Sequence, residues 1–188
     1  VFLFVAIQTL FLSLVALAQS DQKTLSLEQY ITKYKLSQHP NETILINATN
    51  YFRSQDAAIK KSSYFMGQKD VLLWEKEGGF VEWRVNIKRS GLYNMNMLYF
   101  QLPGKGLGIE LGLYIDGKLP FSEAQKITFN RVWKDVTGIR KDKRDNDLRP
   151  KVDEYPMWQQ EDFKDTEGFY NKAFSFYFEK GEHVIRLV

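Results

Sequence analysis

A regular alternation of apolar and polar residues most constrains the fold of this chain from residue 42 onward. The clearest example is the segment 80–87, where Val81, Trp83, Val85 and Ile87 alternate with polar residues. A period of two indicates a strand with one buried face and one exposed face, and it places Trp83 in the core. Weaker alternation marks further strand candidates at 42–47, 71–75, 92–101, 109–115, 173–179 and 182–188.

Short turn motifs separate these strand candidates. Gly78-Gly79, Ser90-Gly91, Asp116-Gly117 and Lys180-Gly181 each follow an apolar segment. Asp-Gly is a strong hairpin signal, and the Lys-Gly turn predicts a final hairpin between 173–179 and 182–188. Many short strands joined by glycine-containing turns predict an all-β fold, namely a β-sandwich.

One short amphipathic helix is predicted before the first strand, over residues 26–36. Ser26 and Gln29 have the spacing of a capping box, and Leu25 with Tyr30 has that of a hydrophobic staple. The apolar stripe consists of Leu27, Tyr30, Ile31 and Tyr34. We expect this helix to lie against the β-domain or to lead into it.

The N-terminal segment predicts export. Val1 to Ala18 is apolar and uncharged, and Ala16-Leu17-Ala18 followed by polar residues fits a signal-peptidase site. A transmembrane helix is the alternative, because about 18 apolar residues is the lower limit for spanning a bilayer. We therefore expect an N-terminally truncated signal peptide at 1–18, a linker and short helix at 19–41, and a C-terminally truncated β-sandwich module at 42–188.

Composition argues against several classes of function. The chain has no cysteine and two histidines, His39 and His183, so disulfides, thiolate sites and multi-histidine metal centres are excluded. The net charge of +3 is small, which argues against nucleic-acid binding. We expect no cofactor, although a structural calcium stays an alternative; the segment 145–147 lacks the ligand spacing of an EF-hand.

Catalysis is also disfavoured, because the sequence has no nucleophile elbow and no phosphate-binding glycine loop. Its carboxylates show no acid–base pair in an apolar setting. Both histidines stand beside turns and are predicted to be surface residues.

The candidate ligand contacts lie in one long stretch, 116–172, where the alternation weakens. Residues 140–154 carry six basic and five acidic side chains, and Trp133 and Trp158 flank them. An exposed indole ring can pack on a pyranose while Asp147 and Arg149 bond its hydroxyls; Tyr170 is a further candidate contact. The alternative is that either tryptophan packs on the edge of the sandwich, with the charged segment as a solvated loop.

Several segments in order resemble one bacterial group of proteins. They are 116–121 (DGKLPF), 129–133 (FNRVW), 140–150 (ending in NDLRP), 156–159 (PMWQ), 167–170 (EGFY) and 174–183 (FSFYFEKGEH). The chain is similar to the N-terminal module of large extracellular solute-binding proteins of ABC sugar transporters, as found in Paenibacillus-like bacteria. The resemblance implies a galactose-binding-like jelly roll, similar to carbohydrate-binding modules.

Two functions follow as expectations. The first is a non-catalytic, extracellular module, secreted or associated with the cell surface, that captures or presents an oligosaccharide. A membrane permease would be its partner through a further domain. The second is a structural or protein-interaction spacer that binds no sugar.

Overall fold

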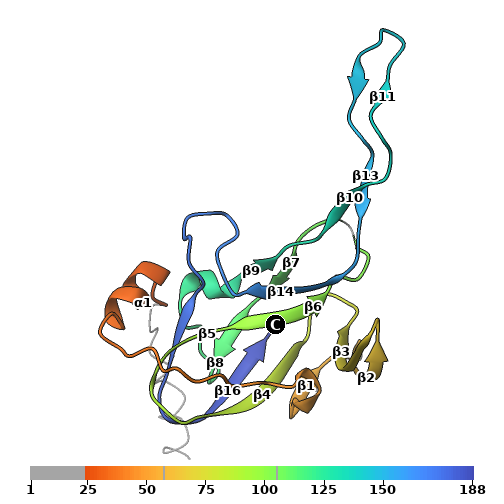
Figure 1. Cartoon of the computed structure of the whole chain (residues 1–188). Coiled ribbons are helices and arrows are strands. Elements are labelled where there is room, and N and C mark those ends of the chain that lie inside the picture. Colours follow the sequence, from red (N-terminus) through yellow and green to blue (C-terminus); the bar gives the residue numbers. More distant parts are fainter. Residues whose placement is uncertain (1–23, 57, 105) are drawn as a thin grey trace, which may run out of the picture.

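The computed structural model describes residues 24–56, 58–104 and 106–188, and the predicted signal peptide at 1–18 lies outside these residues. Strands predominate among them, so the all-β prediction is confirmed (Figure 1). The helical elements are α1 (Leu27–Lys33), η1 (Ala48–Asn50) and η2 (Ser122–Gln125). The strands are β1 (Arg53–Gln55), β2 (Ile59–Phe65), β3 (Gln68–Trp74), β4 (Phe80–Ile87), β5 (Gly91–Asn94), β6 (Asn96–Phe100), β7 (Ile109–Leu111), β8 (Leu113–Ile115), β9 (Ile127–Phe129), β10 (Trp133–Asp135), β11 (Arg140–Lys141), β12 (Asp147–Leu148), β13 (Val152–Glu154), β14 (Trp158–Asp162), β15 (Ser175–Phe178) and β16 (Gly181–Leu187).

The largest sheet is antiparallel and has the order β1-β4-β16-β8. Its central strand β4 matches the predicted segment, and its four alternating apolar side chains, Trp83 included, are buried. Glu82 on the opposite face is buried too, because Arg186 of the neighbouring strand β16 donates a hydrogen bond to it at 2.7 Å.

A second group of strands completes the core. β5 and β6 form one strand interrupted at Met95; β15 pairs with β5, and β14 pairs with β6. Side chains from both groups form a single core cluster, in which Phe121, Phe129 and Phe176 are fully buried. Large rings such as these supply much of the burial energy of a β-domain.

The predicted final hairpin is wrong. β15 and β16 follow one another, but β15 pairs with β5 whereas β16 pairs with β4 and β8. The chain therefore crosses from one sheet to the other at Gly181, whose φ of +140° is one that other residues rarely adopt. Crossing lets Phe176 and Ile185 both face the shared core.

Helix α1 is shorter than predicted but has the predicted start. Ser26 and Gln29 form the capping box, with the Gln29 amide nitrogen 3.3 Å from the Ser26 hydroxyl. Leu27 and Tyr30 are buried, whereas Ile31 is half exposed. The Tyr30 hydroxyl accepts a hydrogen bond from the backbone nitrogen of Tyr177 in β15 at 2.7 Å, so the helix is part of the domain.

The predicted strand over 42–47 does not form. This segment pairs with no strand among the described residues, and Leu45 is 93% exposed. Only Ile44 packs against the core from it. An alternating pattern is thus insufficient where no neighbouring strand accepts the backbone hydrogen bonds.

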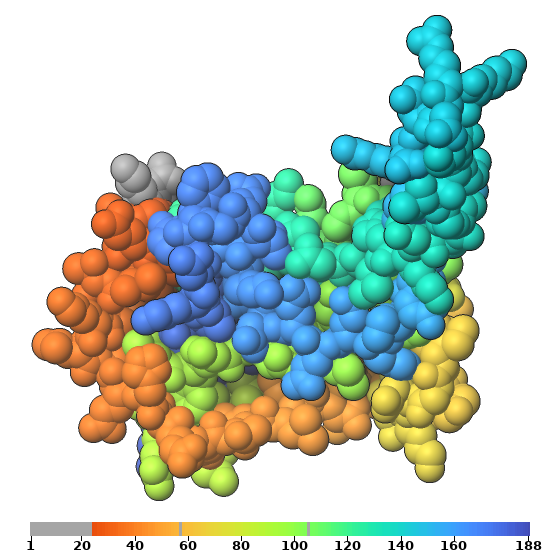
Figure 2. All heavy atoms as spheres, turned by 45° about the horizontal axis from the view of Figure 1, so that its top comes forward, coloured from red at the N-terminus to blue at the C-terminus, as the bar shows by residue number. Residues whose placement is uncertain are grey.

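The stretch predicted to be an irregular loop forms a long antiparallel hairpin instead. Residues 132–155, here called the arm, contain the pairs β10·β13 and β11·β12. The arm projects from the rest of the domain in both views (Figure 1; Figure 2). We call its outer part, residues 140–151, the tip.

Candidate functional site

Trp133 lies at the base of the arm and faces an open cleft. It is 45% exposed and pairs with Glu154 across β10 and β13. The cleft measures about 520 Å³, and its lining residues are Pro103, Gly104, Gly106, Trp133, Asp153, Glu154 and Pro156. A partly exposed indole beside carboxylates is the arrangement expected of a sugar-binding surface, with an apolar face and a few hydrogen-bonding groups.

Two glycines allow the loop on the other side of the cleft to approach Arg131 and Trp133 closely. A Cβ atom at Gly104 would lie 2.5 Å from the Arg131 guanidinium, and one at Gly106 would lie 3.3 Å from the Trp133 ring. Gly106 also has φ +80°, which favours glycine. The shape of the cleft therefore depends on glycine at both positions.

Arg131 holds this loop in place. Its Nη1 donates to the Leu102 carbonyl at 2.7 Å, and its Nε donates to the Leu107 carbonyl. Nη1 is also 3.3 Å from the Glu154 carboxylate, and both side chains are only 12% exposed. Nε and Nη1 of the guanidinium are thus occupied within the protein, and through them Arg131 positions the loop beside the cleft.

Glu154 has one carboxylate oxygen in use and one free. Oε2 accepts hydrogen bonds from the Gly104 amide at 3.2 Å and from Arg131. Oε1 is buried and has no hydrogen-bond partner among the described residues. Because buried polar atoms are nearly always paired, Oε1 is an available acceptor, but the Glu154 side chain has to turn toward the cleft before a ligand hydroxyl can reach it.

Trp158, the second predicted tryptophan, has a different environment. Its Nε1 donates to the Met66 carbonyl at 2.8 Å, and its ring makes edge contacts with Phe65 and Phe100. These contacts attach the β2–β3 hairpin to β6. The structure therefore places Trp158 in the packing arrangement that the sequence left open.

The remaining candidates are dispersed. Asp147 and Arg149 lie exposed in the tip, and Asp147 is seven residues from Glu154 along the strand, about 20 Å at roughly 3.3 Å per residue. Tyr170 packs partly against the core, and its amide donates to Asp165 at 3.0 Å. None of the hydrogen bonds, ion pairs or ring contacts between described residues joins any two of the five predicted residues.

Sequence reasoning missed Glu154, Arg131 and the two glycines of the cleft. The only local signal was the loop Gly104 to Gly108 and the proximity of Arg131 to Trp133 in the sequence. Nothing in the order of residues shows that this loop meets a hairpin that starts more than twenty residues later.

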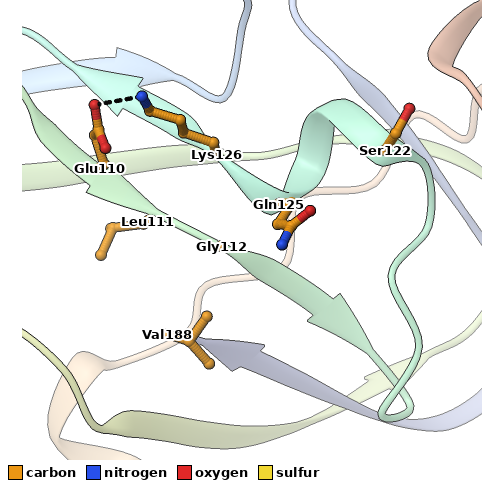
Figure 3. A pocket seen from close by; sticks show the side chains of 7 residues that line it. All are labelled: Glu110, Leu111, Gly112, Ser122, Gln125, Lys126 and Val188. Atoms are coloured by element: carbon orange, nitrogen blue, oxygen red, sulfur yellow. Dashed lines mark ion pairs between the residues drawn. The ribbon is translucent and has the colours of Figure 1, made fainter.

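A second hollow lies between β7 and η2 (Figure 3). Lys126 and Glu110 form an ion pair of 3.0 Å across its edge. Its lining residues are Glu110, Leu111, Gly112, Ser122, Gln125, Lys126 and Val188. None of them is aromatic, so this hollow lacks the stacking surface that the Trp133 cleft has.

The described residues offer no cluster of three or more His, Asp or Glu side chains arranged to hold a metal ion. Within the same residues, no helix has the length and apolar character needed to cross a membrane.

Comparisons with protein-family profiles, curated protein sequences and solved structures found no match to the chain. The resemblance to solute-binding proteins of sugar transporters therefore stays a prediction that rests on the sequence motifs.

Proposed function

We propose that this chain is a non-catalytic carbohydrate-binding module with a galactose-binding-like jelly-roll sandwich. It acts outside the cell as part of a solute-binding protein of an ABC sugar transporter. The observation that carries this proposal is the half-exposed Trp133 ring beside the carboxylates of Asp153 and Glu154 in one cleft. The double crossing between sheets, at β4–β5 and at β15–β16, supports a jelly-roll sandwich.

The proposed contact has two parts. The indole face of Trp133 carries negative π-density and packs against the slightly positive C–H groups of a pyranose ring. The exposed Asp153 accepts a hydrogen bond from a hydroxyl of the same sugar, and the buried Glu154 Oε1 adds a second acceptor once its side chain turns toward the cleft. Because the cleft is open, it suits one or two units of an oligosaccharide rather than an enclosed monosaccharide.

A protein-interaction spacer without sugar binding is the second candidate. It is favoured by the packed position of Trp158 and by the projecting arm. In that case the Trp133 cleft would be a feature of the arm base and would bind no ligand.

Calorimetry with a panel of hexasaccharides (gluco-, xylo-, manno- and galacto-configured) tests the proposal. We expect one class to bind, and Trp133→Ala to weaken binding by about 1–3 kcal/mol, as for a buried contact at an interface. Phe169→Ala is the matched control, because Phe169 is 79% exposed and lies outside the cleft. This variant should bind the oligosaccharide with the same affinity as the unchanged chain.

Two outcomes would refute direct sugar capture. One is the absence of binding across the panel. The other is binding whose affinity is the same in the Trp133→Ala variant. Either result would leave the spacer function as the better account.

A further inference from the structure

The excess positive charge of the chain is concentrated in the arm tip. Residues 140–151 contain six basic and three acidic side chains, a formal charge of +3, which equals that of the whole chain. The rest of the chain is thus balanced between acidic and basic residues. All six basic side chains of the tip are exposed, and the tip stands away from the domain (Figure 2).

The turn at the end of the tip has a defined shape. Asp142 Oδ1 accepts hydrogen bonds from the amides of Arg144 at 2.7 Å and Asn146 at 2.9 Å. Lys141 and Asp145 form an ion pair of 2.8 Å. Two of the three acidic residues are therefore engaged within the turn, which presents Lys143 and Arg144 to solvent.

Aliphatic side chains accompany these charges. Val136, Ile139, Leu148 and Val152 are each between 41% and 71% exposed. The arm is only two strands wide, and no second layer of the described residues covers it, so both of its faces are open to water. The segment 136–152 has no aromatic residue, so it offers no stacking surface for sugar rings or bases.

We propose that the arm docks on an anionic phospholipid surface. The basic tip binds the headgroup phosphates, and Ile139 and its aliphatic neighbours enter the boundary between headgroups and acyl chains. A nucleic acid or an acidic polysaccharide would satisfy the charges but would leave the aliphatic side chains in water. An anionic bilayer provides both phosphate and hydrocarbon, which is why we favour it.

This inference does not depend on sugar binding, because the turn that carries Lys143 and Arg144 lies beyond Asp147, which is itself about 20 Å along the chain from Glu154 at the cleft. Docking through the arm would hold the cleft near the membrane surface. The arm would thus have a role in membrane docking that is separate from ligand binding in the cleft.

Vesicle flotation tests the inference, with residues 19–188 so that the apolar segment 1–18 does not itself bind the vesicles. We expect flotation with vesicles of equimolar phosphatidylglycerol and phosphatidylcholine at low salt, weaker flotation at high salt, and none with phosphatidylcholine alone. The double variant Lys143→Gln and Arg144→Gln should lower the partition coefficient by roughly thirtyfold, about fivefold per neutralised residue. Lys69→Gln with Lys76→Gln, two exposed lysines of the body, should leave it unchanged.

A separate variant tests the aliphatic contribution. Ile139→Ser should reduce the partition coefficient while the salt dependence stays as in the unchanged chain, because it removes hydrocarbon and no charge. All these positions are exposed and outside the core, so the urea midpoint should be the same in every variant.

Three results would overturn the proposal. The first is no flotation with phosphatidylglycerol vesicles. The second is an equal loss for the tip variant and the body control, which would indicate nonspecific attraction. The third is vesicle binding that Ile139→Ser does not alter, together with binding to polygalacturonate or DNA at similar strength, which would assign the tip to soluble polyanions.

Discussion

The Arg131 guanidinium and the Glu154 carboxylate lie 3.3 Å apart, nearly buried, between the arm base and the loop that faces Trp133. This ion pair joins β13 to the segment before β10, and Arg131 also binds the carbonyls of Leu102 and Leu107. The contacts of Arg131 therefore hold the arm base and the loop together, and with them the shape of the cleft.

Arg131→Met should destabilise the protein strongly. The substitution leaves the Glu154 carboxylate buried without its counter-charge, and we expect the free energy of unfolding to fall by about 2–4 kcal/mol in urea denaturation. Arg53→Met is the control, because Arg53 is 62% exposed and 3.7 Å from Glu82, so it should cost less than about 1 kcal/mol. Equal losses in the two variants would show that the Arg131 pair is not effectively buried.

Gln101→Leu should loosen the arm base. Gln101 is fully buried; its side-chain oxygen accepts from the Val132 amide, and its nitrogen donates to the Val132 carbonyl at 3.1 Å. Leucine would leave the Val132 amide unpaired, whereas the Val132 carbonyl keeps its hydrogen bond from the Tyr155 amide at 2.8 Å. We therefore expect a loss of about 1–3 kcal/mol and faster amide hydrogen exchange at the arm base than in the unchanged chain. Unchanged exchange at the arm base would contradict this role of Gln101.

Tyr30→Phe should weaken the attachment of helix α1. Burial, the dominant cause, raises the pKa of Tyr30 to about 12, and its hydroxyl satisfies the amide of Tyr177. Phenylalanine removes that acceptor, with an expected cost of about 1–2 kcal/mol in unfolding free energy. Tyr34→Phe retains the ring that stacks on Tyr177 and should change stability by no more than about 0.5 kcal/mol. If Tyr30→Phe leaves the free energy of unfolding unchanged, the attachment of helix α1 contributes little to the stability of the domain.

His183 should make stability depend on pH. The sequence predicted a surface residue, but its side chain is only 13% exposed and contacts two acceptors, the Asp116 carboxylate at 2.6 Å and the Glu179 carbonyl at 2.8 Å. Burial alone would lower the pKa of His183; the hydrogen bonds to Asp116 and Glu179 outweigh it and raise that pKa above 6.5.

A raised pKa in the folded state means that the stabilisation is complete below the unfolded pKa and is lost as pH rises through the folded pKa. We therefore expect a higher urea midpoint at mildly acidic pH than at alkaline pH. His183→Gln should remove this dependence, since glutamine does not titrate. If the urea midpoint of His183→Gln depends on pH as strongly as that of the unchanged chain, other titratable groups cause the dependence.

Local sequence was sufficient for the features whose energy is local. The capping box at Ser26, the alternation in β4 and the Asp116-Gly117 turn all formed as predicted. In that turn both residues have positive φ, and Ile115 and Lys118 exchange backbone hydrogen bonds, as a two-residue hairpin turn requires. Each feature depends on residues only a few positions apart.

Tertiary structure decided what depends on distant partners. Alternation makes a strand of 173–179 and of 182–188, but the choice between a hairpin and a crossing depends on β4, β5 and β8. The segment 42–47 alternates as well and stays unpaired, because no strand edge is available to it among the described residues. Trp133 and Trp158 are equivalent in the sequence. Trp158 packs against Phe100 and donates a hydrogen bond to the Met66 carbonyl. Trp133 instead lies beside the loop of Gly104 and Gly106, which Arg131 holds in place, and its ring stays partly exposed.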